Sequence, residues 1–168
     1  MSKGVEKLKD EYQRYERGSN PEEREMLEDI GCAFFIPIND DYLHWAGVIN
    51  GPNNSPYENG RYFFEMKFTN NYPNEGPIDV RMKTPIYHPN INNLNGHICL
   101  HYLYKWENTY NIAGIALAIY ELLFYPNPAS SYKPINISKA KEFNKKYAYS
   151  QCFHSIDWNN NWDKGWNL

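Results

Sequence analysis

The sequence has few cysteines, no excess of positive charge and no long apolar run, and each absence excludes a class of protein. Its three cysteines form no C-x-x-C pair, which argues against both a disulfide framework and a structural zinc site. The net charge of −3 and the lack of a basic run give no electrostatic reason to expect nucleic-acid binding. The longest apolar run, residues 112–120, is far shorter than a membrane span, so no membrane partner is expected.

A secretory signal is also missing, because Met1 is followed at once by a charged, helix-forming stretch. Together with the unpaired cysteines, this predicts a reducing compartment, the cytoplasm or the nucleus. The 168 residues are most simply one domain, long enough to bury a sizeable core. Aromatic residues make up 17% of the chain, so aromatic packing should dominate that core.

Helices are predicted near both ends of the chain and once between them. Residues 3–17 are amphipathic at helical spacing, and residues 21–29 follow an N-capping Asn20 with a proline and acids in the first turn. Residues 112–124 are apolar nearly all round, which indicates a buried helix. A last helix is predicted over residues 138–149.

Between the first helices and residue 84 the pattern is that of strands joined by short turns. The predicted strands cover residues 32–38, 43–49, 61–68 and 78–83. We therefore predict an α+β fold: a four-stranded antiparallel meander sheet with one solvated face, an N-terminal helix, a central buried helix and a C-terminal helix. Residues 151–168 form an Asn- and Trp-rich tail whose tryptophans recur every fourth residue, and a self-docking aromatic seal is favoured over a partner motif.

The stretch that can carry chemistry runs from residue 86 to residue 106. The turn His88-Pro89-Asn90 leads into an Asn/Gly-rich loop, residues 92–96, that can reverse the chain and return Cys99 towards Asn90. A thiol beside a carboxamide N–H provides a nucleophile and an oxyanion stabiliser.

Other interpretations of these residues stay open on composition alone. Cys99 lies between Ile98 and Leu100 and could be a buried core thiol. His97 and His101 flank it at two residues on either side, so a Cys/His hydrolase dyad is a further alternative. No partner spacing supports a metal site at the upstream His88, for which bracing the turn is favoured.

An ordered set of motifs over residues 3 to about 150 resembles the ubiquitin-conjugating enzyme family. The motifs are H-W at 44–45, G-P…S-P-Y-x-x-G at 51–60, F-x-x-x-Y-P at 68–73, Y-H-P-N-I at 87–91, G-x-I-C-L at 96–100, Trp106 and P-N-P at 126–128. The predicted order of helices and strands agrees with that family independently. Residues 1–150 are then a catalytic core of this type, with 18–31 as an inserted segment and 151–168 as an added tail.

The resemblance implies a role for each matched residue. Cys99 would form a thioester with ubiquitin or a ubiquitin-like protein, Asn90 would steady the oxyanion or the loop, and His88 would brace the turn. Such an enzyme takes the modifier from an activating enzyme, in an ATP-dependent pathway, and passes it to a lysine, often with a ubiquitin ligase. It needs no metal or organic cofactor of its own. The alternatives are a binding module with little activity and a carrier of another ubiquitin-like modifier.

The chain departs from the family at the rim of this site and on its ligase-facing loops. His101 stands where the family usually has an acid, so it is a candidate to accept the lysine proton, and Ser130 or Ala129 stands at a second acidic position. On the loops, polar residues replace apolar contacts and predict an atypical ligase surface. They are Asn74, Glu107, Asn108 and Thr109.

Overall fold

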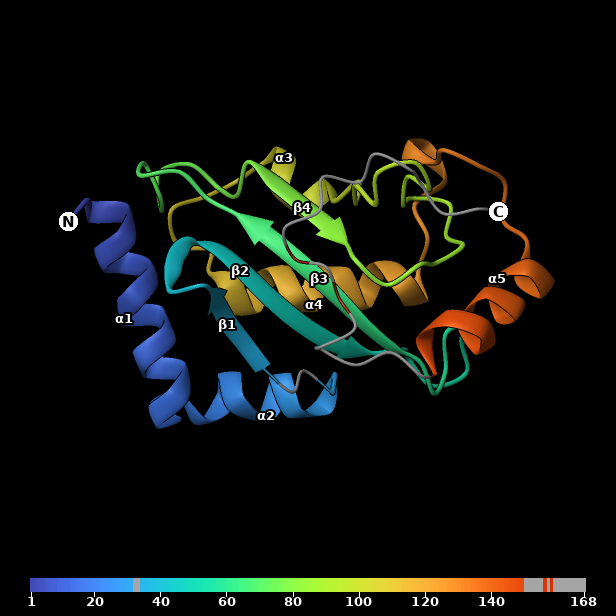
Figure 1. Ribbon diagram of the computed structural model, residues 1–168, viewed down its shortest axis with the longest axis horizontal. Helices are drawn as coiled ribbons and strands as arrows, with labels where there is room; N and C mark the ends of the chain where they lie inside the picture. The colour runs from blue at the N-terminus through green and yellow to red at the C-terminus, as the bar shows by residue number, and fades with distance from the viewer. Residues whose placement is uncertain (32–33, 150–155, 157, 159–168) are drawn as a thin grey trace.

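The centre of the molecule is a four-stranded antiparallel sheet in the order β1-β2-β3-β4. The structure is a computed structural model that describes residues 1–31, 34–149, 156 and 158 (Figure 1). The strands are β1 Phe34–Ile38, β2 Asp41–Asn50, β3 Arg61–Lys67 and β4 Asp79–Met82. The predicted meander is confirmed, and only the first two residues of its first strand, including Cys32, lie outside the described residues.

The tightest connection, between β1 and β2, turns through Asn39 and Asp40. Both residues have positive φ, 53° and 60°. A hairpin turn of this kind matches the twist of its flanking strands, and Asn and Asp tolerate the left-handed region better than most residues. On the other side of β2, the register with β3 places Trp45 opposite Met66, and both side chains are fully buried on the inner face of the sheet.

The predicted helices are present, and their first turns explain where they begin. They are α1 Lys3–Arg17, α2 Pro21–Asp29, α4 Ile112–Phe124 and α5 Ile137–Phe143, with one π-type turn, Asn144–Ala148, continuing α5. Asparagine side chains cap three of them, each accepting the N–H of the third residue on: Asn20, Asn111 and Asn136. A four-residue helix that the sequence pattern did not predict, α3 His101–Tyr104, follows Cys99 directly.

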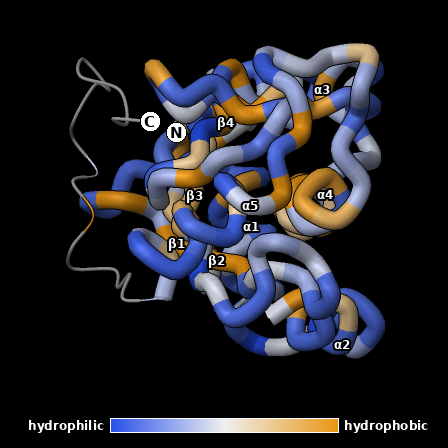
Figure 2. The backbone as a smooth tube through the Cα atoms, turned by 90° about the vertical axis from the view of Figure 1, so that its right-hand side faces the viewer, coloured by the Kyte–Doolittle hydropathy of each residue, from blue (hydrophilic) through white to orange (hydrophobic). Residues whose placement is uncertain are grey.

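Helix α4 lies behind the sheet, with α1 at one end and α5 at the other (Figure 1). Most of its residues have the colour of hydrophobic residues in Figure 2, and the side chains of Ile115 and Ile119 are fully buried. Burying each such side chain stabilises the fold by roughly 1.5–3 kcal/mol before entropy is counted. The prediction of a buried central helix is confirmed. No helix in the described part of the chain has both the length and the apolar character needed to cross a membrane.

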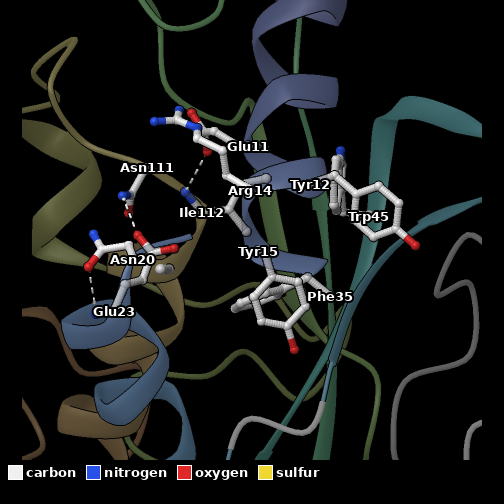
Figure 3. Close-up of a pocket in the computed structure, with 11 residues that line it drawn as sticks. Glu11, Tyr12, Arg14, Tyr15, Asn20, Glu23, Phe35, Trp45, Asn111 and Ile112 are labelled. Carbon is white, nitrogen blue, oxygen red and sulfur yellow. Dashed lines mark hydrogen bonds between the residues drawn. The ribbon is translucent and has the colours of Figure 1, made fainter. Parts of the chain in front are cut away.

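The amino end of α4 is held by α1 and by α2 (Figure 3). The carboxylate of Glu11 accepts the Tyr72 hydroxyl at 2.6 Å and the Ile112 N–H at 3.2 Å, and burial raises the pKa of Glu11. Glu23 of α2 accepts an N–H of Asn111 at 3.1 Å. A cavity of about 120 Å³ lies among these groups. Glu11 and Glu23 thereby tie α1 and α2 to the first residues of α4.

The outer face of the sheet differs from the prediction, because its centre is not solvated. Val48, Phe63 and Glu65 point away from α4 and are only 0%, 1% and 2% exposed. One described contact on this face comes from the C-terminal segment. Among the described residues, the indole ring of Trp158 meets the ring of Phe63 edge-on, with centroids 6.3 Å apart.

Candidate functional site

The turn that leads to the site is fixed by a buried histidine. Nδ1 of His88 accepts the Asn90 N–H at 3.0 Å, so the ring proton lies on Nε2, which donates to the Leu122 carbonyl at 2.9 Å. Burial lowers the pKa of His88 to about 4, so the ring is neutral at physiological pH. These contacts join the turn to the carboxyl end of α4 and are those of a bracing imidazole.

The side chain of Asn90 is fully buried, and the loop after α4 occupies all of its polar atoms. Its Nδ2 donates to the Asn127 carbonyl at 2.7 Å and to the Ser130 carbonyl at 3.1 Å. Its Oδ1 accepts the Asn127 N–H at 2.8 Å. An amide has two N–H donors, and both are used. The geometry therefore gives Asn90 the loop-bracing role, with no N–H left over for an oxyanion.

The Asn/Gly loop returns the chain beside this turn, as the sequence predicts. Ile91 and Ile98 form a bridge across it, and Gly96 takes the positive φ of 70° that its reversal needs. The backbone N–H of Cys99 then donates to the Asn90 carbonyl at 2.9 Å. Cys99 is half-buried, so its thiol remains within reach of a partner.

A tyrosine that sequence reasoning missed lies against the thiol. The hydroxyl of Tyr104, at the end of α3, lies 3.1 Å from Sγ of Cys99. This hydrogen bond raises the pKa of Tyr104, so the phenol keeps its proton at neutral pH. Tyr132, from the loop after α4, also lies near the sulfur, and burial and the thiol together raise its pKa. A helix that begins just after Cys99 brings the side chain of Tyr104 back towards the thiol. Predicting that helix from the sequence would have identified Tyr104 as a neighbour of Cys99.

The two histidines near Cys99 do not form a dyad with it. Nδ1 of His97 lies 3.2 Å from the Tyr132 hydroxyl, and the exposed ring of His101 packs edge-on against Tyr104 at a centroid distance of 6.2 Å. The sulfur is hydrogen-bonded to a phenol instead. The hydrolase interpretation thus lacks a histidine base among the described residues, whereas a thiol on an exposed rim, above a fully braced turn, suits acyl transfer to an incoming group.

Comparison with known proteins identifies the family. The family model described as ubiquitin-conjugating enzyme matches residues 8–155. The chain belongs to the ubiquitin-conjugating enzyme family. The predicted α+β fold of that family is confirmed as well, because similar solved structures share the four-stranded antiparallel sheet and its helices.

Three solved ubiquitin-conjugating enzyme structures illustrate the likeness. A Plasmodium yoelii protein assigned to this class is 26% identical, with a TM-score of 0.73, and the match covers 90% of this chain and 99% of that one. The E2 domain of a Toxoplasma gondii ubiquitin-conjugating enzyme is 27% identical, with a TM-score of 0.65 over 76% and 98% of the two chains. Pex4p of H. polymorpha, solved in complex with the soluble domain of Pex22p, is 25% identical, with a TM-score of 0.73 over 88% and 97%.

The two loops that the sequence predicts to face a ligase lie side by side. Trp106 links them, because its Nε1 donates to the Pro73 carbonyl at 2.8 Å and its ring packs close against Gly76. Four exposed polar side chains stand on this pair of loops: Asn74, Glu107, Asn108 and Thr109. The structure thus brings these predicted contact residues onto one surface.

The remaining candidates lie at the rim or outside the description. Ser130 is half-buried beside Asn127, with its carbonyl bound to Asn90, and Ala129 is exposed. No carboxylate contacts the thiol among the described residues. Cys152, another of the three cysteines, lies outside the described residues.

Proposed function

We propose that this ubiquitin-conjugating enzyme family member carries ubiquitin, or a ubiquitin-like protein, as a thioester on Cys99 and transfers it to a lysine. The observation that carries the proposal is the accessible Cys99 thiol at the family's motif position, fixed by its backbone bond to Asn90.

Two acyl transfers make up the proposed reaction. In the first, the Cys99 thiolate attacks the carbonyl carbon of the modifier's thioester on the activating enzyme, and that enzyme's thiolate leaves. In the second, a neutral lysine amine attacks the new thioester, Cys99 leaves as a thiolate, and the amine proton goes to a base or to water. The chain itself supplies the position of the sulfur and the groups around it, since the energy of the bond comes from the activating step.

The Tyr104 hydroxyl supports the first transfer. Since this phenol keeps its proton, it can donate a hydrogen bond to the thiolate that attacks and to the thiolate that later leaves. In the part of the chain that the structure describes, no carboxylate stands beside the sulfur to receive the lysine proton in the second transfer. We assign that task to His101, whose exposed imidazole lies on the same short helix as Tyr104.

The test is charging with ubiquitin-activating enzyme, ATP and ubiquitin, read on a non-reducing gel. Wild-type protein should form an adduct that reductant removes and that Cys99→Ala abolishes. Cys32→Ala and Cys152→Ala are matched controls and should charge normally. If the wild-type chain charges with no ubiquitin-like modifier, the alternative of a conjugating-enzyme-like binding module replaces this proposal.

For its ligase partners, we propose weak engagement of RING-type domains. The polar Asn74 stands where an apolar side chain anchors such an interface in the family, and losing a buried anchor can cost about 2 kcal/mol, or roughly thirtyfold in affinity. Asn74→Phe should therefore increase the acceleration of discharge by RING domains, while Asn71→Phe on the same exposed turn should not. Strong acceleration of the wild-type chain by a RING panel would contradict this assignment.

A further inference from the structure

The outer face of the sheet carries apolar side chains and an ion pair that are buried from water. Antiparallel sheets that carry helices on one side commonly leave the other side to water. Here Val48 and Phe63, which pair across β2 and β3, put apolar side chains at the centre of that other side. Beside them the Glu65 carboxylate lies 3.4 Å from the Lys83 ammonium and 2.9 Å from Nε2 of His44, and both Glu65 and Lys83 are nearly inaccessible to water.

The described helices do not provide this cover. Helix α4 packs on the inner face, α2 contacts α4, and Tyr12 of α1 reaches the inner-face Trp45. Trp158, by contrast, is seated on Phe63 with the two rings inclined by 69°, the edge-to-face arrangement that aromatic pairs prefer. The Arg61 guanidinium lies 5.6 Å from the centre of the same Phe63 ring.

We propose that the outer face of the sheet, centred on Val48, Phe63, Glu65 and Lys83, is an interaction surface whose occupant is this chain's own C-terminal segment, anchored by Trp158. The segment binds in cis: Trp158 lies nine positions after Tyr149, the end of the last described helical turn, and its ring already contacts Phe63. The cover removes an apolar pair from water and desolvates the ion pair beside it. A second protein can use this face only by displacing Trp158.

This assignment is independent of the thioester chemistry, and covalent footprinting of lysine amines tests it. Purified full-length chain is treated with an N-hydroxysuccinimide acetate, and acylation of Lys83 is measured by mass spectrometry against the exposed Lys141. Trp158→Ala should acylate Lys83 at least about fivefold faster than wild type, because losing the aromatic pair raises the fraction of uncovered molecules. Trp158→Phe keeps a ring and should stay within about twofold of wild type.

Trp166→Ala is the matched control, since it removes another tail tryptophan and should leave Lys83 protected. Equal Lys83 rates in wild type and Trp158→Ala, with unchanged melting temperatures, would overturn the proposal. So would an equal increase in Trp166→Ala, because Trp158 would then not be the anchor.

The same footprint separates the occupants. A segment bound in cis protects Lys83 equally at about 1 µM and about 100 µM chain, whereas a segment supplied by a second copy loses its protection on dilution and would overturn the assignment. A foreign partner as the native cover would leave Lys83 of the purified chain reactive, which would overturn it too.

Discussion

Replacing Asn90 by alanine separates two roles that a buried amide near a nucleophile can have. As an oxyanion donor, Asn90 would matter only while an acyl group is being transferred. As a brace, it would matter to the folded chain at all times. Its three hydrogen bonds, to the Asn127 N–H, the Asn127 carbonyl and the Ser130 carbonyl, favour the brace.

The loss of stability in Asn90→Ala can be estimated from the backbone groups that lose their hydrogen-bond partner. One N–H and two carbonyls lose a partner next to a side chain that is fully buried, and a net hydrogen bond in such a place is worth about 1 kcal/mol, with a larger penalty where water cannot replace it. We expect the free energy of unfolding to fall by roughly 2–4 kcal/mol. In a domain of this size that lowers the melting temperature by roughly 5–15 °C.

Three assays on one preparation of Asn90→Ala test this expectation. They are denaturant unfolding, ubiquitin charging and single-turnover discharge to free lysine. We expect charging and discharge to fall together, because the 127–130 loop that borders the thiol loses its position. Asn92→Ala is the matched control: it removes one bond, to the Leu94 N–H at 2.8 Å, at an exposed place in the neighbouring loop and should cost less than about 1 kcal/mol. A stable Asn90→Ala that charges normally but discharges about a hundredfold more slowly would refute the reasoning and restore the oxyanion role.

Three further outcomes are expected. The buried His88 has a pKa of about 4 and stays neutral between pH 7 and pH 5, whereas the imidazole of the unfolded chain takes up a proton. Lowering the pH over this range should therefore reduce the free energy of unfolding by about 2 kcal/mol. Urea unfolding of His88→Gln should lack that loss. Equal pH slopes in the two proteins would contradict this. Tyr104→Phe should slow iodoacetamide alkylation of Cys99 about two- to fivefold, since its hydroxyl is exposed and water replaces part of the bond, while Tyr102→Phe should not. His101→Ala should slow discharge to lysine about tenfold or more without affecting charging, and discharge at the wild-type rate from pH 6 to pH 9 would exclude the histidine as the proton acceptor.

The fold was largely predictable because its signals are local. Residues 3–17 and 112–124 carry the period of helices, the capping asparagines mark where helices begin, and Asn39-Asp40 marks the hairpin turn. Boundaries were less reliable where tertiary contacts decide. Ile78 fits the alternation of the last strand, yet it lies just before β4 and is 66% exposed.

The site was predictable in its position but not in its contacts. The turn at His88, the loop and the return of Cys99 to Asn90 follow from proline, glycine and asparagine chemistry. The direction of the Asn90 amide does not, because it depends on the 127–130 loop, some forty residues away in sequence. Tyr104 was missed because α3 is only four residues long and has no side-chain cap to announce it. The burial of the outer face was missed because the described contact on it comes from Trp158, more than ninety residues after Phe63.

The groups around Cys99 form a buried set and an exposed set, and we expect this protein to differ from its relatives in the exposed set. The buried set, His88 and Asn90, matches the family's motif and makes a full complement of hydrogen bonds, so the sulfur is positioned by the usual means. In the exposed set, His101 stands where the family usually has an acid, and the Tyr104 hydroxyl lies 3.1 Å from the sulfur. Accepting a modifier needs only the positioned thiol, whereas passing it to lysine also needs that proton to leave. Under the proposed function, we therefore expect His101 to affect the rate of lysine transfer rather than the ability of the chain to be charged.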